Sequence, residues 1–320
     1  MESIQNLIKD ELQVFEDKFR QAVKSRVSLL DRIMQYIVKR KGKQIRPMFV
    51  FLSARLFNPV DESTYRAAAL VELLHTATLV HDDVVDESME RRNFFSINAL
   101  WKNKVAVLVG DYLLSKGLLL SLKNDDFEIL KILSTAVERM SEGELLQIEK
   151  SRSLNLDENV YFEIIKNKTA SLLASACGAG AWSTTQNKEI THKMELFGEN
   201  AGIAFQIKDD LFDYGSEAIG KPTGNDIKEK KLTLPLIYTL SNVSQSTKKD
   251  LICILKNKNK NRDAVKHVID EVITCGGIDY TKEKMAHYRD EAIRILYEFP
   301  QNEIRNGLEE LVRFTTDRKY

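Results

Sequence analysis

Cysteine is scarce in this chain of 320 residues, and so is any excess of charge. The three cysteines, Cys177, Cys253 and Cys275, are scattered and form no C-x-x-C pair. This spacing excludes a disulfide framework and a thiolate zinc site, and it favours a reducing, cytoplasmic compartment. Lys and Arg number 47, as do Asp and Glu, so the net charge is zero. A neutral chain has no general attraction to nucleic acid or to an anionic membrane, and we expect neither as a partner.

Helix-breaking residues and strand patterns are also rare. The chain has 5 prolines and 14 glycines, and alternating runs of β-branched residues are nearly absent. Apolar residues instead recur at helical spacing, as in Leu70, Leu73, Leu74, Ala77 and Val80. No linker or repeat divides the sequence. We therefore predict an all-α protein with a single domain over residues 1–320, built as a bundle of antiparallel helices around a central cavity.

The periodic segments predict about fourteen helices. The longest are expected over 2–24, 62–90, 96–123, 125–150 and 188–215. A loop is expected over 215–233, and a loop of that length in a helical domain is more often a functional lid than a plain connection. The longest uncharged stretch, 169–187, is rich in Ser, Ala and Gly. We interpret it as a close-packed interior helix and expect no membrane-inserted segment.

Two acidic clusters of the same form stand near the ends of two long predicted helices. Their members are Asp82, Asp83 and Asp86 in the first, and Asp209, Asp210 and Asp213 in the second. Because the first and last aspartates of each cluster are four residues apart, they project from one face of a helix, and the middle one lies about 100° away. Apolar neighbours and the negative end of the helix dipole disfavour ionised carboxylates there unless a cation neutralises them.

Mg²⁺ is the cation that suits such clusters, because it takes oxygen ligands and binds through one or two carboxylates plus substrate phosphates. A single isolated cluster is also typical of a solvated helix end. Two copies in apolar surroundings, each followed by a basic loop, favour the metal interpretation. A di-iron bundle would need Glu-x-x-His pairs among its acidic ligands. The chain has this spacing at Glu72–His75 and Glu189–His192, and both lie outside the two aspartate clusters.

Cations stand beside both acidic clusters and at a predicted helix start. Lys43 and Arg46 open a helix, whose free N–H groups make an anion site. The others are Arg91, Arg92, Lys168, Lys221, Lys230 and Lys231. Each alone is typical of a solvated surface charge. Together they indicate two phosphorylated substrates, one held through metal ions and one held directly by Arg, Lys and His75, while Gln147 and Gln206 offer neutral polar contacts.

Taken in order, these segments resemble the all-trans (E) polyprenyl diphosphate synthases, the head-to-tail prenyltransferases of isoprenoid synthesis, and in pattern the medium- and long-chain bacterial members most. The resemblance covers nearly the whole chain. It rests on the segments 42–47 (GKQIRP), 75–88 (HTATLVHDDVVDES), 109–112 (VGDY), 168–170 (KTA), 205–213 (FQIKDDLFD), 220–224 (GKPTG) and 231–236 (KLTLPL). One D-D-x-x-D motif alone would be weak, whereas this ordered set is specific. It implies the all-α isoprenoid synthase type I fold.

The resemblance also implies a role for each site residue. Three Mg²⁺ would be bound by the six aspartates Asp82, Asp83, Asp86, Asp209, Asp210 and Asp213. The allylic diphosphate would be held by Arg91, Lys168, Thr169, Gln206, Lys221 and Lys231, with Lys168 also taking part in catalysis. Isopentenyl diphosphate would be held by Lys43, Arg46, His75 and Arg92. The allylic C–O bond would then ionise, the isopentenyl double bond would attack the allylic cation, and a proton would be lost.

Two positions depart from the family pattern. Asn93 follows the arginine pair where the family usually carries glycine. Lys230 stands where glycine often precedes the lysine matched by Lys231, which leaves open which of the two lysines contacts phosphate.

The length of the product is expected to depend on residues just before the first cluster. In this family the product grows into a tunnel beside that helix, and short-chain synthases often place an aromatic residue one turn before the motif. Here Ala77 and Thr78, both small, occupy that turn. We therefore predict a hexaprenyl to octaprenyl or longer product, which would suit a quinone side chain.

Other interpretations stay open. A short-chain (farnesyl or geranylgeranyl) diphosphate synthase is the nearest, and analysis of the product separates the two. A terpene cyclase shares the fold but would need neither the basic site at 42–47 nor a second full aspartate motif. A non-catalytic subunit of a heteromeric synthase usually lacks the aspartate motifs, which are intact here. We expect an active homodimer in the cytoplasm.

Overall fold

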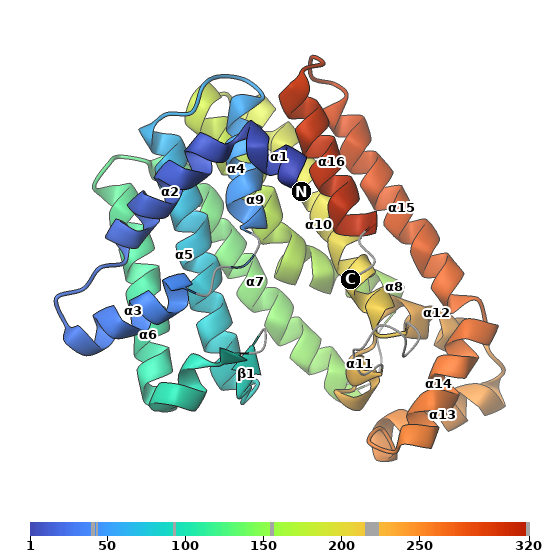
Figure 1. The fold of residues 1–320 in the computed structure, drawn as a ribbon. Helices are drawn as coiled ribbons and strands as arrows, with labels where there is room; N and C mark the ends of the chain where they lie inside the picture. Colours follow the sequence, from blue (N-terminus) through green and yellow to red (C-terminus); the bar gives the residue numbers. More distant parts are fainter. Residues whose placement is uncertain (40–41, 43, 92–93, 154–156, 215–223, 318–320) are drawn as a thin grey trace. The chain divides into compact units, whose positions relative to one another are not determined.

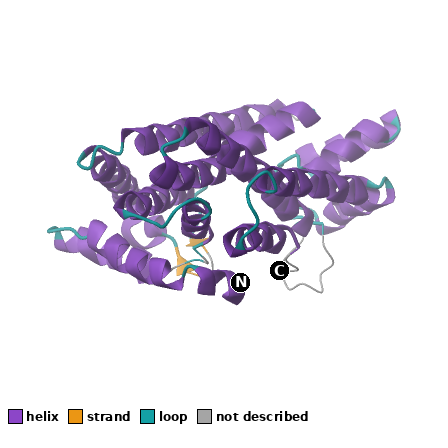
Figure 2. Cartoon of the chain, turned by 90° about the horizontal axis from the view of Figure 1, so that it is seen from above, coloured by secondary structure: helices purple, strands orange, loops and turns teal. Residues whose placement is uncertain are grey.

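The computed structural model describes residues 1–320 except 40–41, 43, 92–93, 154–156, 215–223 and 318–320. Helices dominate the described residues, whose one sheet is a short two-stranded hairpin (Figures 1 and 2), so the all-α prediction is confirmed. The chain groups into two compact units. The first comprises Met1–Val137, Leu172–Glu195 and Pro300–Leu308, and the second comprises Glu138–Ser171, Leu196–Phe299 and Glu309–Tyr320. The single domain over 1–320 stays a prediction.

The first unit holds the N-terminal helices and the helix that carries the first aspartate cluster. Its elements are α1 (Glu2–Leu7), α2 (Lys9–Ala22), α3 (Ser28–Lys39), α4 (Ile45–Arg55), α5 (Glu62–Val85), β1 (Glu90–Arg91), β2 (Phe94–Phe95), α6 (Ile97–Leu122) and nearly all of α9 (Ser171–Thr185). Residues 47–54 of α4 are all buried, and this helix is apolar on every side. α4 therefore belongs to the core of the unit.

The second unit holds the second aspartate cluster. Its elements are α8 (Glu158–Ile165), the π-helix η1 (Lys166–Ala170), α11 (Asn225–Lys228), α12 (Leu234–Asn242), α13 (Gln245–Asn257), α14 (Arg262–Thr274) and α15 (Gly277–Leu296). α7 (Phe127–Ser153), α10 (Lys188–Phe212) and α16 (Glu303–Asp317) have residues in both units. Apolar side chains of α8, α10 and α12 to α15 form the core of this unit, among them Ile207, Leu236 and Val268.

Close packing of α5 on α6 positions the first cluster. A Cβ atom added to Gly110 of α6 would lie 2.1 Å from Nε2 of His81, and one added to Gly117 would lie 2.6 Å from Cδ1 of Leu70. The contact that lies further along α6 lies nearer the start of α5, so the two helices are antiparallel. Gly110 is required because any side chain there would displace His81, which directly precedes Asp82.

The predicted helices agree with the structure except at some ends. The segment expected as one helix over 2–24 is two helices, because Ile8 leaves helical angles (φ −130°, ψ 30°). α5 ends at Val85 instead of residue 90, because Glu87 takes a left-handed φ of +50°. The hairpin that follows pairs Glu90 with Phe95. Its two-residue strands are too short to show the alternating pattern that predicts a strand.

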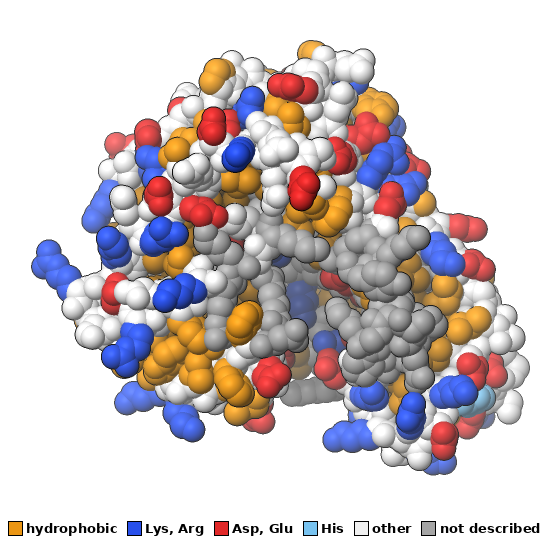
Figure 3. Space-filling view, in the orientation of Figure 1, with side chains coloured by type: hydrophobic (Ala, Val, Ile, Leu, Met, Phe, Trp, Pro, Cys, Tyr) orange, Lys and Arg blue, Asp and Glu red, His pale blue; other side chains and the backbone are white. Residues whose placement is uncertain are grey.

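α6 carries an apolar surface. It is the one helix in the described part of the chain that is long and apolar enough to cross a membrane, by length and composition alone, and 33% of its most apolar window is buried. Its exposed side chains include Val107, Leu108, Leu118, Leu119 and Leu122. These recur within about a third of the helix circumference, and we name them the α6 stripe. Figure 3 shows further hydrophobic side chains gathered over the hairpin and the lower end of α6.

Lys102 interrupts the helical geometry of α6. Its backbone angles are φ 72° and ψ 158°, a region occupied almost only by glycine. We expect Lys102→Gly to stabilise the protein by about 1–2 kcal/mol, because relief of strain exceeds the added entropy of the unfolded chain. Thermal or urea unfolding measures the change. Lys104→Gly is the matched control, which should destabilise by about 1 kcal/mol because residue 104 has helical angles. If Lys102→Gly and Lys104→Gly changed the stability equally, the backbone at Lys102 would not be strained.

Candidate functional site

The first aspartate cluster ends α5 in the first unit. Asp86 is the C-cap residue, and its N–H donates to the carbonyl of Asp82 at 2.8 Å. Asp82 is half-buried and Asp86 is exposed, so two carboxylates four residues apart share one face of the helix end. Asp83 is buried, with 4% of its surface exposed. Nδ2 of Asn98, in the first turn of α6, donates to the main-chain oxygen of Asp83 at 3.0 Å and ties the end of α5 to α6.

Three more predicted residues lie further back along α5. His75 is buried and stands seven residues before Asp82, which places both on one face of the helix. Thr78 is half-buried, and its Oγ1 donates to the carbonyl of His75 at 2.8 Å. Ala77 is completely buried. Ala77 therefore lies in the interior of the first unit, where a larger side chain would have to displace its neighbours or fill a cavity.

The predicted isopentenyl diphosphate site is described only in part. Arg46 is half-buried in the first turn of α4, which begins after Gln44. Arg91 forms β1 with Glu90, and its side chain lies outside the described part of the structure. Lys43, Arg92 and Lys221 lie outside the described residues.

The second cluster ends α10 in the second unit, and its members have different surroundings. Asp209 is half-buried. Asp210 is 6% exposed, and both of its carboxylate oxygens accept hydrogen bonds from protein groups. Tyr161 donates its hydroxyl to Oδ2 at 2.7 Å, and Gln206 donates Nε2 to Oδ1 at 3.0 Å. Burial raises the pKa of Asp210 to about 7, against the lowering effect of these two bonds.

Asp213 lies just beyond α10 and holds the start of α11. Its carboxylate accepts the backbone N–H groups of Asn225 and Asp226 at 2.8 and 3.0 Å. Burial raises the pKa of Asp213, and burial together with the nearby Asp213 raises the pKa of Asp226 to about 6. Asp226 is thus an acidic neighbour of the cluster that motif analysis missed. It stands 13 residues further along, in a segment expected to be loop, and the short helix α11 brings it close.

The predicted Lys168-Thr169 pair lies on η1, between α8 and α9. Such π-turns occur frequently at functional sites. Nζ of Lys168 forms an ion pair with Glu144 of α7 and donates to Oε1 of Gln147 at 3.3 Å. Oγ1 of Thr169 donates to Oε1 of Gln206 at 2.8 Å. The structure therefore joins Thr169 and Gln206, predicted from two separate segments of the sequence, to Asp210 in the second unit, with Lys168 next to Thr169 on η1.

Lys230 and Lys231 point to different partners. Nζ of Lys230 donates to the carbonyl of Lys256, at the end of α13, at 3.1 Å. Nζ of Lys231 lies 2.6 Å from a carboxylate oxygen of Glu229, and its backbone N–H donates to the carbonyl of Asp226 at 2.8 Å. Lys231 therefore adjoins the second cluster through its backbone, and we keep it as the candidate phosphate contact.

The carboxylates of each cluster fit a magnesium site of the kind that substrate completes. No group of three or more His, Cys, Asp or Glu side chains forms a metal cage in the described ranges. Mg²⁺ needs no such cage, since it binds through one or two carboxylates, waters and phosphate oxygens. Asp82 and Asp86 supply such a pair in the first unit, and Asp209 and Asp213 supply one in the second. Asp83 and Asp210 are buried, and their part in metal binding stays a prediction.

Asp210 makes stability depend on pH. Because its pKa is higher in the folded chain than in the unfolded one, its contribution to stability is complete below about pH 4 and is lost as the pH rises through about 7. In the absence of metal, the free energy of unfolding of Asp210→Asn relative to that of wild type should therefore be about 2 to 3 kcal/mol higher at pH 8 than at pH 5. Urea unfolding in chelator at both pH values measures this difference. Glu189→Gln, at an exposed position of α10, is the control and should show no such change.

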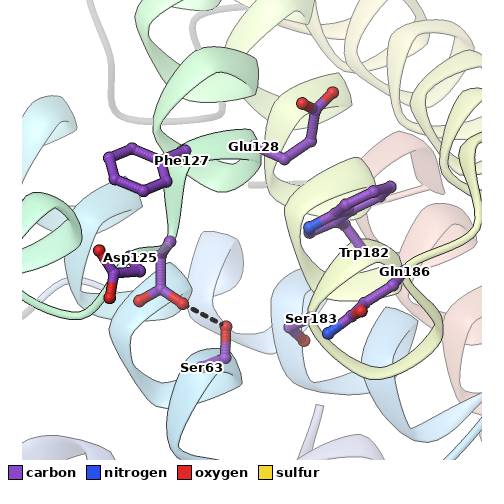
Figure 4. Close-up of a pocket in the computed structure, with 8 residues that line it drawn as sticks. Ser63, Asp125, Phe127, Glu128, Trp182, Ser183 and Gln186 are labelled. Atoms are coloured by element: carbon purple, nitrogen blue, oxygen red, sulfur yellow. Dashed lines mark hydrogen bonds between the residues drawn. The ribbon is translucent and has the colours of Figure 1, made fainter.

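The first unit also holds a pocket (Figure 4). Its volume is about 230 Å³, and it is lined by Ser63, Asp125, Asp126, Phe127, Glu128, Trp182, Ser183 and Gln186. The hydroxyl of Ser63 donates to Asp126 at 2.8 Å, and Arg66 forms an ion pair with the same carboxylate. Ser63 stands at the start of α5, about 28 Å along the helix from Asp82. The pocket shares no residue with the predicted site.

Comparison with known proteins identifies the chain. The model of the polyprenyl synthetase family matches residues 27–272. The all-trans-nonaprenyl-diphosphate synthase (geranyl-diphosphate specific) of Rhodobacter capsulatus is 35% identical over 306 residues, which cover 94% of this chain and 93% of the relative. The geranylgeranyl diphosphate synthase of Saccharolobus solfataricus is 33% identical over 313 residues, 94% of each chain.

A solved structure agrees with these relatives. The polyprenyl synthase of Caulobacter crescentus, complexed with calcium and isoprenyl diphosphate, superposes with a TM-score of 0.91 at 32% identity, over 100% of this chain and 98% of the other. Enzymes of this family depend on divalent metal ions and bind isopentenyl and allylic diphosphates. With its all-α isoprenoid synthase fold, the chain belongs to the polyprenyl synthetase family, a family of prenyltransferases.

Proposed function

We propose that this enzyme elongates an all-trans polyprenyl diphosphate by condensing isopentenyl diphosphate with an allylic diphosphate. One observation supports this best. In each unit a long helix ends in two aspartates four residues apart. In the second unit Thr169 is hydrogen-bonded to Gln206, and Gln206 to Asp210, while the adjacent Lys168 contacts Gln147. A departing diphosphate group gains negative charge. Metal ions held by the acidic pairs, and cationic side chains near the phosphates, would stabilise that charge.

The metal ions would be held by Asp82 and Asp86 in one unit and by Asp209 and Asp213 in the other. Bound Mg²⁺ supplies positive charge that offsets the negative charge gained by a departing diphosphate. We propose three such ions, with Asp83 and Asp210 as further ligands. The i, i+4 spacing at a helix end and the partial exposure of the outer carboxylates support this assignment.

The remaining residues would bind and orient the two substrates. Lys168, Thr169 and Gln206, with Arg91, Lys221 and Lys231, would hold the allylic diphosphate. Lys43, Arg46, His75 and Arg92 would hold isopentenyl diphosphate. The allylic C–O bond breaks as the diphosphate takes its electron pair. The isopentenyl double bond then attacks the allylic carbon, and the resulting cation loses a proton. Held diphosphates keep the reacting carbons in place, and apolar walls keep water from the cation.

A medium or long product is the favoured outcome, because Ala77 is fully buried and small and Thr78 beside it is half-buried. The nonaprenyl synthase relative supports a long chain, and such a product would suit a quinone side chain. The geranylgeranyl relative, at 33% identity, favours a short-chain product as the second candidate.

The deciding experiment incubates the purified single chain with farnesyl diphosphate, isopentenyl diphosphate and Mg²⁺, followed by mass analysis of the dephosphorylated products. Hexaprenyl to octaprenyl or longer alcohols are expected. Geranylgeraniol alone would establish the short-chain candidate. No condensation with any allylic starter would overturn the proposal and favour a non-catalytic subunit of a heteromeric synthase.

We also propose that the enzyme is a cytoplasmic homodimer. The α6 stripe is an apolar helix face on the surface of the first unit, and such faces are typical of contacts between subunits. Lys104 and Asp111, both exposed, lie along the same side of α6 and are opposite in charge, which suits pairing of the helix with a second copy of itself. Sedimentation equilibrium at assay concentration should give twice the chain mass of 36.7 kDa.

A further inference from the structure

A buried tyrosine outside every sequence motif contacts the second aspartate cluster. Tyr161 lies on α8, whose N-cap residue Asp157 accepts the N–H of Val160 at 2.9 Å. Tyr161 is 4% exposed, and its hydroxyl donates to Oδ2 of Asp210 at 2.7 Å. The partners are 49 residues apart in the sequence. A buried tyrosine fills the core equally well without its oxygen, so the hydroxyl has a role only through this bond.

Two further side chains extend this hydrogen bond into a series of three. Oδ1 of Asp210 accepts Nε2 of Gln206 at 3.0 Å, and Oε1 of Gln206 accepts Oγ1 of Thr169 at 2.8 Å. Both oxygens of the carboxylate and both ends of the amide are therefore engaged. The chain Tyr161–Asp210–Gln206–Thr169 joins α8, α10 and η1 within the second unit. We name it the Tyr161 network.

The direction of each hydrogen bond follows from the carboxylate. Oδ1 of Asp210 accepts the amide N–H of Gln206, which leaves the amide oxygen of Gln206 facing Thr169. Thr169 must then donate its hydroxyl hydrogen to that oxygen. The rotamer of Thr169 is thereby set beside Lys168, its neighbour on the π-turn. If Tyr161 no longer held Oδ2, Asp210 could rotate, and the orientation of Gln206 and Thr169 would be lost with it.

We propose that Tyr161 is a positioning residue for the allylic diphosphate, acting through Asp210 and Gln206 on Thr169. The inference rests on the proposed function and adds to it a residue and a direction of action. It makes Asp210 a member of a protein hydrogen-bond network, which its two engaged oxygens support. It also assigns Tyr161 no contact with substrate.

Tyr161→Phe tests the proposal, because it removes one oxygen atom and keeps the ring. We expect kcat/KM for farnesyl diphosphate to fall by about tenfold, the effect of losing one hydrogen bond to a charged group, while KM for isopentenyl diphosphate stays within about twofold. Calorimetry with a non-reactive allylic thiolodiphosphate and Mg²⁺ should show about the same tenfold loss of affinity. This second readout does not depend on turnover.

Tyr280→Phe is the matched control. Tyr280 also donates to a carboxylate borne by α8, at 2.7 Å from both oxygens of Glu158, and it has no part in the Tyr161 network. Both variants should lose similar stability, measured by thermal unfolding. Only Tyr161→Phe should weaken binding of the analogue. If the two variants bind the analogue equally, Tyr161 is merely structural and the proposal is overturned.

A double-mutant cycle tests the route of action. If Tyr161 acts through Thr169, Tyr161→Phe combined with Thr169→Val should bind the analogue no more weakly than Thr169→Val alone. Independent, additive losses would overturn the proposed route. The failure of the proposed function is distinguishable, since it would appear as absence of condensation by the wild-type enzyme, whereas failure of this inference would appear as an active wild type with an unaltered Tyr161→Phe.

Discussion

Asp82→Ala and Asp209→Ala are each expected to lower Mg²⁺-dependent turnover by about a thousandfold or more, because each removes a carboxylate from the outer face of its cluster. The two residues are half-buried at the ends of α5 and α10, where a neighbouring carboxylate four residues on completes the pair. Loss of one member leaves a metal ion with one protein ligand. Radiolabelled isopentenyl diphosphate incorporation measures turnover over a Mg²⁺ series.

The helical fold should survive both substitutions, since neither residue belongs to the buried core. Far-ultraviolet circular dichroism and thermal unfolding check this. Glu189→Ala is the control, because Glu189 is an exposed acid at the start of α10 and should keep wild-type turnover. Wild-type rates in Asp82→Ala or Asp209→Ala would remove the metal assignment of that cluster.

Ala77→Phe is expected to shorten the product by several isoprene units. A helix turn advances about 5.4 Å, comparable to one extended isoprene unit, so a ring placed one turn before Asp82 would stop the chain early. Ala77 is completely buried, so the added ring must project into the interior of the first unit. Chromatography of the dephosphorylated products measures their length against polyprenol standards.

The same burial carries a risk of overpacking, which typically destabilises by about 1–3 kcal/mol. Ala77→Leu, a smaller addition, keeps the test informative and should shorten the product less. Val14→Phe, on the surface of α2, is the control for an added ring and should leave product length unchanged. Unchanged length in an active, folded Ala77→Phe would show that the floor of the tunnel lies elsewhere.

The site was only partly predictable, and the missing parts share one property. Spacing along a helix predicts that Asp82 and Asp86 share a face, because that relation depends on nearby residues alone. It also places Asp210 about 100° round the helix from Asp209. It cannot identify Tyr161 as the partner of Asp210, because the two residues are 49 positions apart in the sequence. Asp226 was missed for the same reason, since only the fold of α11 against Asp213 brings the two acids together.

By itself, the sequence determined the helical class, the approximate positions of the long helices, and the family, through motifs that lie in order along the chain. These follow from local periodicity and from residue types that chemistry requires at short spacing. Tertiary structure alone decided that α5 ends at Val85, that Lys102 is strained, and that Asp210 is held by Tyr161 and Gln206. The burial of a residue and its hydrogen-bond partners depend on segments that are distant in the sequence, so the local sequence pattern does not predict them.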